Sequence, residues 1–169
     1  VPVELPLPES HVALDSERGQ ALLSQSTDKA DYSGLWKSYT AQQYRSYCGV
    51  ATGVMAVSAL DPKTPLNQDS WFTPDAEKVR SGWDTFFGGM TLAQFSGLIE
   101  AHGYVSEFQH GGDFDLKSFR QTVQTNLKNP RDMIVVNYAR KSIGQKGGGH
   151  FSPLAAYPAA EDRVLILDV

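Results

Sequence analysis

The sequence predicts an α+β fold, with a helical first part built around a buried central helix and an antiparallel sheet after it. Before residue 130 the apolar residues recur at helical spacing, whereas after it they form short runs rich in Val, Ile and aromatic residues. No internal repeat or long linker divides the 169 residues, a length usual for one domain. We therefore expect a single domain over residues 1–169, entered by a Pro-rich extended segment over residues 1–11.

Four helices are expected in the first part. A helix over residues 12–26 is supported by only a few leucines, whereas the helix from Cys48 to Leu60 is apolar or small at nearly every position. A helix of that composition is typical of a buried central position. The pair Asp61-Pro62 ends it, since proline cannot continue the hydrogen-bond ladder.

In the rest of the chain, residue patterns that predict loops alternate with patterns that predict helices and strands. Residues 62–90 contain three prolines and a Gly-Gly pair, and we expect loops there. Thr91 and Gln94 form a capping-box pattern that begins the third helix, and Asp115 caps the fourth, which ends before Pro130. Three strands follow, over residues 133–138, 151–157 and 163–169.

The net charge of −4 and the pI near 5.5 restrict the partners. Nucleic acid and membrane surfaces favour a basic patch, so we expect neither as a partner. No apolar run approaches the length of a membrane span. The chain does not begin with Met, which fits both a removed signal peptide and a partial sequence. The compartment therefore stays open, with a periplasmic or secreted location preferred to the cytoplasm.

Cys48 is the single cysteine of the chain, which excludes a disulfide framework or a thiolate zinc site. A lone cysteine is most often a small buried hydrophobe. Cys48, however, lies where an irregular stretch over residues 40–47 enters the central helix. The unpaired N–H groups and the dipole at a helix N-terminus favour a thiolate. We therefore interpret Cys48 as a candidate nucleophile.

His150 and Asp168 are predicted to face each other in a hairpin formed by the last two strands. If the turn of this hairpin is centred on Ala159, the two residues become cross-strand neighbours within hydrogen-bond reach. A carboxylate beside an imidazole fixes its tautomer and favours its protonated form, which suits pairing with a thiolate. The alternative is a solvent-exposed histidine at the end of a glycine loop.

Acyl transfer also needs hydrogen-bond donors for the oxyanion that develops on the substrate. Gln42 and Gln43 precede Cys48 by six and five residues. The side chain of either would supply one donor, with the backbone N–H of Cys48 as the other. A solvated surface glutamine is the alternative for both, and the spacing does not choose between them.

Four ordered segments of the chain resemble the catalytic domain of phytochelatin synthases, above all their short single-domain bacterial members. These segments are residues 42–51, 135–138, 148–154 and 165–169. The resemblance implies a papain-like fold. By position it implies the following roles: nucleophile Cys48, base His150, orienting acid Asp168 and oxyanion donor Gln42 rather than Gln43.

The resemblance also implies a reaction. In that family the cysteine attacks the Cys–Gly bond of glutathione, glycine leaves, and a γ-glutamylcysteinyl thioester remains, which a second glutathione or water accepts. Arg140 falls where the family has an arginine that contacts substrate, with a solvated surface arginine as the alternative. Asn137, Gly148 and Gly149 are further candidates for contact with the substrate.

Two features of the family are not found in this sequence, namely a segment after the position of Val169 and the Cys-rich C-terminal region of eukaryotic members. We therefore expect deglycylation of glutathione to exceed peptide synthesis. No tightly bound cofactor and no protein metal site is expected, and Cd²⁺ or Zn²⁺ would enter as a thiolate complex with the substrate. A homodimer is allowed for. The alternatives are a papain-like peptidase of other specificity and a non-catalytic thiol- or metal-binding protein.

Overall fold

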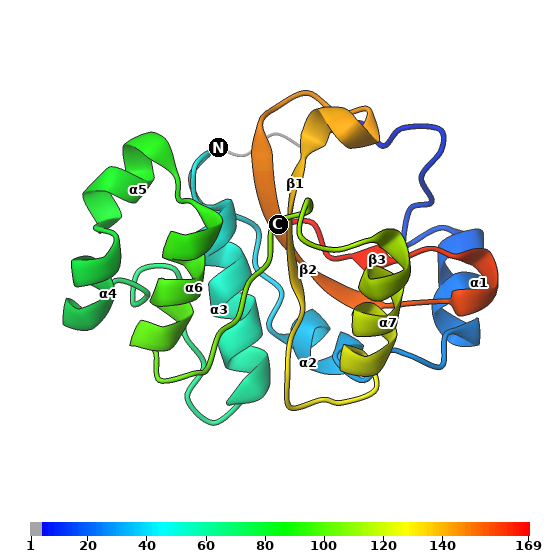
Figure 1. Cartoon of the computed structure of the whole chain (residues 1–169), viewed down its shortest axis with the longest axis horizontal. Helices are drawn as coiled ribbons and strands as arrows, with labels where there is room; N and C mark the ends of the chain where they lie inside the picture. Colours follow the sequence, from blue (N-terminus) through cyan, green and yellow to red (C-terminus); the bar gives the residue numbers. More distant parts are fainter. Residues whose placement is uncertain (1–4) are drawn as a thin grey trace.

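The computed structural model describes residues 5–169, which form seven α-helices and one three-stranded antiparallel sheet (Figure 1). The α+β class is therefore confirmed. The described elements are α1 (Glu17–Gln25), α2 (Tyr32–Lys37), α3 (Cys48–Leu60), α4 (Pro74–Val79), α5 (Gly82–Gly88), α6 (Leu92–Ala101), α7 (Leu116–Asn126), β1 (Val135–Ala139), β2 (Gly149–Ala156) and β3 (Leu165–Ile166). The first four residues of the predicted lead-in lie outside the described residues, and residues 5–11 contain neither helix nor strand.

The central helix α3 begins and ends where the sequence predicts, and it is buried from Gly49 to Ser58. Its small residues lie where other parts of the chain approach closely. A Cβ added at Gly53 would lie 2.3 Å from the ring of Trp71, and one added at Gly49 would lie 2.5 Å from the sulfur of Met90. Glycine at position 53 is therefore needed for the helix to pack against the Trp71 ring, whereas a larger residue at position 49 would displace the Met90 side chain.

The central strand of the sheet is β2, which pairs with β1 on one side and β3 on the other. Its alternate residues face two separate layers of the core. Ala155 packs with Met55 of α3 and Leu35 of α2, whereas Leu154 packs with Val123 near the end of α7. This burial on both faces fixes β2 between α3 and α7, so that the sheet is anchored directly against the central helix.

The third strand is much shorter than predicted. Residues 163–169 were expected to form it, but β3 contains only Leu165–Ile166. A register shift between Leu154 and Ala156 interrupts the ladder, and the chain then leaves the pairing after one further bond, from the Leu167 N–H to the Pro153 carbonyl. On the β1 side His150 pairs with Tyr138, whereas on the β3 side the ladder ends before Asp168 can pair with it.

Residues 62–73 contain neither helix nor strand, as expected for a loop-rich stretch, but the expectation is wrong for the rest of residues 62–90, which contains α4 and α5. Pro74 is the first residue of α4, where its missing N–H costs nothing, and Thr73 caps that helix. Ser81 caps α5 in the same way. The short helix α2 was not predicted, and α1 begins later than expected because Ser16 is its cap.

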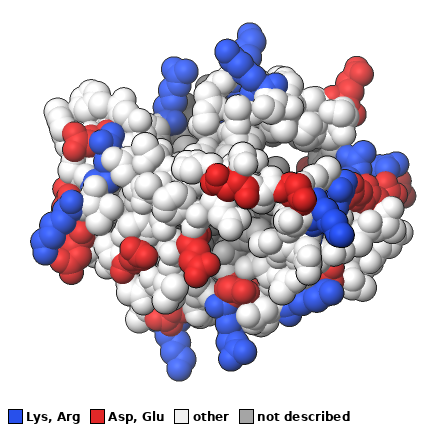
Figure 2. All heavy atoms as spheres, in the orientation of Figure 1, with Lys and Arg blue, Asp and Glu red and all other residues white. Residues whose placement is uncertain are grey.

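The predicted capping residues of α6 and α7 are confirmed. Thr91 and Gln94 form reciprocal side-chain to backbone bonds, and Asp115 accepts a bond from the Ser118 N–H. Over residues 5–169, no helix is both long and apolar enough to cross a membrane. Figure 2 shows acidic and basic side chains interspersed on one face, without a continuous basic patch.

Candidate active site

The half-buried Cys48 is the first residue of α3, so its backbone N–H has no acceptor within the helix. Burial alone would raise the pKa of its thiol. Hydrogen bonds with the His150 side chain and with the backbone of Phe151 and Gly49 outweigh burial and hold this pKa below its ordinary value. Cys48 is therefore placed where a thiolate is favoured.

The imidazole of His150 is the partner of that thiol, and it is almost fully buried on β2. Its Nε2 lies 2.6 Å from Oδ1 of Asp168, which leaves Nδ1 for the sulfur of Cys48. Burial lowers the pKa of His150, but the bonds with Asp168 and Cys48 raise it by more, so the net shift is upward. The ring of Tyr138 meets the imidazole edge-on, with the ring centroids 5.7 Å apart.

These opposite shifts favour a thiolate–imidazolium pair over two neutral groups. The thiol of Cys48 loses its proton more easily than an ordinary cysteine, and the imidazole of His150 keeps its proton more readily than an ordinary histidine. Such a pair combines a nucleophile with an acid that can protonate a leaving group.

Asp168 is held on two sides, by His150 and by Arg140. The guanidinium of Arg140 donates from Nη2 to Oδ1 across 2.9 Å and from Nη1 to Oδ2 across 3.0 Å. Burial would raise the pKa of Asp168, but the bonds from His150 and Arg140 lower it to about 2. The carboxylate is therefore ionised at every physiological pH, as a group that orients an imidazole must be.

The structure also shows the surroundings of Arg140. Its guanidinium is mostly buried and bonds to Gln145 as well as to Asp168, and its Nη2 lies 2.8 Å from Nε2 of His150. Arg140 does not line the cavity at Cys48. The predicted substrate contact of Arg140 stays a prediction, since its charge is already paired with a carboxylate in this structure.

Gln42 and Gln43 are placed differently by the structure. The amide of Gln42 donates to the carbonyl oxygens of Tyr44 and Arg45, at 2.8 and 2.9 Å. Its two N–H groups therefore hold the loop that leads into α3. Gln43 has an exposed side chain, and its backbone N–H bonds to Gln68. In this structure neither glutamine presents a free amide to the sulfur.

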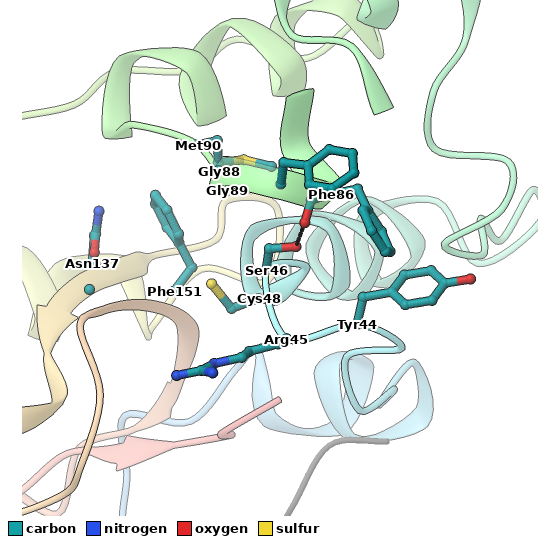
Figure 3. A pocket seen from close by; sticks show the side chains of 12 residues that line it. Tyr44, Arg45, Ser46, Cys48, Phe86, Gly88, Gly89, Met90, Asn137 and Phe151 are labelled. Carbon is teal, nitrogen blue, oxygen red and sulfur yellow. Dashed lines mark hydrogen bonds between the residues drawn. The ribbon is translucent and has the colours of Figure 1, made fainter. Parts of the chain in front are cut away.

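A cavity of about 640 Å³ opens over Cys48 (Figure 3). Its lining comes from three parts of the chain that are far apart in sequence. The contributing residues are Tyr44, Arg45, Ser46 and Cys48 before and at the start of α3, Phe86, Phe87, Gly88, Gly89 and Met90 in and after α5, and Asn137, Gly149 and Phe151 on the sheet. Of the predicted substrate residues, Asn137 and Gly149 line this cavity, whereas Gly148 is exposed outside it.

The sequence pointed only weakly to the side of the cavity formed by α5. The pair Gly88-Gly89 was a signal for a turn, and Gly89 does adopt a positive φ of 65°. Ser46 joins this side to the nucleophile loop by donating to the carbonyl of Phe86 across 2.7 Å, as drawn in Figure 3. No spacing in the sequence indicates that these segments meet.

The described residues contain no group of three or more His, Cys, Asp or Glu side chains that could hold a metal ion. The His150–Asp168 pair has Cys48 beside it, but all three groups are engaged with one another and with Arg140. This arrangement can supply a thiolate at Cys48 with His150 beside it to donate or accept a proton.

Comparison with known proteins finds matches over most of the chain. Residues 3–169 match the sequence model of the family described as phytochelatin synthase. A glutathione gamma-glutamylcysteinyltransferase of Schizosaccharomyces pombe is 29% identical over 171 residues, which are 96% of this chain and 41% of that protein. Glutathione gamma-glutamylcysteinyltransferase 3 of Lotus japonicus is 28% identical over 98% of this chain and 36% of its own length.

A third relative is glutathione gamma-glutamylcysteinyltransferase 1 of Arabidopsis thaliana, which is 27% identical over 182 residues, 98% of this chain and 35% of that protein. This chain thus spans between 35% and 41% of the length of the three relatives. The family match over residues 3–169 includes Cys48, His150 and Asp168.

Proposed function

This chain belongs to the phytochelatin synthase family, and we propose that it is a glutathione γ-glutamylcysteinyltransferase that works through a thioester on Cys48. The observation that carries the proposal is the hydrogen-bonded series Cys48–His150–Asp168, of which Cys48 lines an open cavity. The names of the relatives support glutathione as the substrate. We also propose that residues 1–169 form one papain-like catalytic domain, with the nucleophile helix packed against the sheet that carries the base.

The first half of the reaction forms the acyl-enzyme. The thiolate of Cys48 attacks the carbonyl carbon of the Cys–Gly bond of glutathione, and the electron pair of that carbonyl moves to its oxygen. His150 then gives its Nδ1 proton to the glycine nitrogen, the C–N bond breaks, and glycine leaves. The products are free glycine and a γ-glutamylcysteinyl thioester on Cys48.

The second half transfers the acyl group. His150, now neutral, takes a proton from the attacking amine of a second glutathione or from water. Attack by glutathione lengthens the (γ-Glu-Cys) chain, and attack by water releases γ-glutamylcysteine. Both routes return the Cys48 thiolate and the His150 imidazolium. We propose that Cd²⁺ or Zn²⁺ takes part as a thiolate complex with the substrate, since the protein side offers one cysteine.

The oxyanion needs two donors in this mechanism. The backbone N–H of Cys48 is the first, because it lacks an acceptor within α3. The Gln42 amide is the second, after it turns away from the carbonyl oxygens of Tyr44 and Arg45, to which it donates in this structure. Binding of substrate would then exchange two loop bonds for one bond to the oxyanion.

The test is an incubation of the full chain with glutathione, with and without Cd²⁺. We expect released glycine and, by intact mass, a γ-glutamylcysteinyl adduct on Cys48 in a short quench. Cys48→Ala should abolish both, whereas Ser24→Ala, at an exposed residue of α1 outside the cavity lining, should keep both. Equal release of glycine by the wild type and Cys48→Ala would refute the proposal.

Substrate controls separate this function from that of a general peptidase. The isomer with an ordinary α-linkage, α-Glu-Cys-Gly, should be a much poorer substrate than glutathione. If α-linked peptides are cleaved as fast as glutathione, the enzyme is a papain-like peptidase of broader specificity. Cadmium binding without adduct or glycine would instead indicate a non-catalytic thiol-binding protein.

A further inference from the structure

The cavity over Cys48 has one basic lining residue, Arg45. Apart from Cys48, the other lining side chains described for it are aromatic, aliphatic or neutral and polar, and none is a carboxylate. Arg45 thus places a positive charge in the cavity three residues before the nucleophile, and the Cys48 thiolate is the one anionic group in the lining. A ligand that enters beside Cys48 meets this charge without a competing carboxylate on the cavity wall.

The guanidinium of Arg45 has no hydrogen-bond or ion-pair partner among residues 5–169. Arg140 is different, because its guanidinium is already paired with the carboxylate of Asp168. The backbone of Arg45 is nevertheless fixed. Its carbonyl accepts from Gln42 at 2.9 Å, and the turn around it is closed by a 3.0 Å bond from the Tyr47 N–H to the Tyr44 carbonyl. A free donor on a fixed backbone is suited to a ligand.

The cavity has a polar side and an aromatic side. In Figure 3 the Arg45 side chain extends toward the side of Cys48 on which Asn137 lies, away from Phe86 and Tyr44. Asn137 also has a side chain without a hydrogen-bond partner in the described part of the chain, and its Oδ1 lies over Gly149, 3.4 Å from where a Cβ would be. Two unpaired polar groups therefore face the cavity on one side of the sulfur.

We propose that Arg45 binds a carboxylate of the substrate and so determines specificity. A planar guanidinium with parallel N–H groups is the side chain that best matches a carboxylate. This inference rests on the proposed function for the identity of the ligand, because glutathione has two carboxylates, one on the leaving glycine and one on the γ-glutamyl residue. Asn137 supplies a neutral donor on the same side of the cavity.

The first experiment is independent of glutathione. Iodoacetate and iodoacetamide alkylate the same sulfur and differ in that iodoacetate carries a carboxylate. The ratio of their rates at Cys48 cancels any change in the thiolate fraction. Arg45→Gln should lower the iodoacetate-to-iodoacetamide ratio by about 10-fold, since one charge-assisted pair contributes about that factor. Arg131→Gln, at an exposed arginine outside the cavity lining, should leave the ratio unchanged.

The second experiment identifies the carboxylate. kcat and KM are measured for glutathione, for its glycyl ethyl ester and for 4-aminobutyryl-Cys-Gly, which lacks the γ-glutamyl carboxylate. For glutathione, Arg45→Gln should raise KM about 10- to 100-fold with a smaller effect on kcat. With the wild type, the KM of one of the two analogues should exceed the KM of glutathione by this same factor. Arg45→Gln should not raise the KM of that analogue further. That analogue lacks the group that Arg45 binds.

The outcomes separate this inference from the proposed function. If the wild type forms no Cys48 adduct with glutathione, the proposed function fails, and the alkylation ratio still tests Arg45. If the wild type forms the adduct but Arg45→Gln leaves KM and the alkylation ratio unchanged, Arg45 is a solvated arginine and the inference alone is overturned. The same holds if Arg45→Gln weakens all three substrates equally.

Discussion

Thr52 donates its hydroxyl hydrogen to the carbonyl oxygen of Phe151 across 3.0 Å, and both residues are buried. Thr52 lies one turn after Cys48 on α3, and Phe151 follows His150 on β2. This bond therefore joins the helix that carries the thiol to the strand that carries the imidazole. The distance between the Cys48 thiol and the His150 imidazole therefore depends on two elements that are about 100 residues apart in sequence.

Thr52→Val should separate the effects of shape and of hydrogen bonding at this contact. The variant leaves the Phe151 carbonyl without its donor, and we expect a loss of about 1–3 kcal/mol in the free energy of unfolding, measured in urea. Alkylation of Cys48 by iodoacetamide near neutral pH should slow as well, because the imidazole is less well placed. Thr52→Ser keeps the hydroxyl and should retain most of the alkylation rate. Equal alkylation rates for Thr52→Val and Thr52→Ser would contradict a role of this hydrogen bond in placing the imidazole.

The pH dependence of Cys48 alkylation reports the thiolate. In the folded protein the bond with His150 lowers the pKa of Cys48, so the alkylation rate should stay high below the pH at which a free thiol loses reactivity. His150→Ala removes the largest of the causes that lower this pKa, whereas burial still raises it. The midpoint of the rate profile should therefore move to higher pH. A profile that does not move would exclude a thiolate–imidazolium pair.

Arg140→Gln distinguishes a positioning residue from a substrate-binding residue. In the structure the guanidinium holds Asp168 and lies outside the cavity lining. Its loss should let the carboxylate and the imidazole shift, and a misplacement of about 1 Å is enough to lower kcat about 100-fold. KM for glutathione should change little, and Arg140→Lys should recover part of kcat. A large rise in KM with kcat unchanged would instead support the substrate contact inferred from the sequence.

Part of the fold could be predicted because a local pattern determined it. The bounds of α3 follow from a run of small and apolar residues closed by Asp61-Pro62, and the caps of α6 and α7 follow from residue types. The short helices α2, α4 and α5 contain six or seven residues each. Segments of this length are too short to show a helical period and are stabilised mainly by packing. Their existence therefore depends on the tertiary structure.

In the site, too, some features follow from the sequence pattern and others depend on the tertiary structure. A symmetric hairpin predicts that His150 and Asp168 are neighbours, and they are in contact at 2.6 Å. The register behind that prediction is nevertheless wrong, because a bulge shifts β3 and Asp168 reaches the imidazole from beyond the strand. Spacing cannot reveal that Arg140 is paired with Asp168, 28 residues away, or that Phe86 lies in the same cavity as Arg45.

Asp31 is a buried carboxylate far from this chemistry in sequence, and neither of its oxygens has a hydrogen-bond partner. Burial and the nearby charge of Asp132 raise its pKa from 3.8 to about 7. The folded state thus holds a proton at Asp31 that the unfolded state releases above pH 4. The free energy of unfolding should therefore fall as the pH rises from about 4 to 7 and remain lower above that range.

Asp31→Asn should remove this pH dependence, because asparagine has nearly the same shape and no charge to bury. We expect the variant to be more stable than the wild type by about 1–3 kcal/mol at pH 8 and nearly equal to it below pH 4, by urea unfolding. Asp28→Asn is the matched control, since Asp28 is also buried but accepts a bond from Thr27 and lies 4.0 Å from Lys128. If the free energy of unfolding of Asp31→Asn still falls with pH as steeply as that of the wild type, the prediction is contradicted. The Asp31 carboxylate would then be solvated in the folded protein, since only a desolvated acid holds its proton near neutral pH.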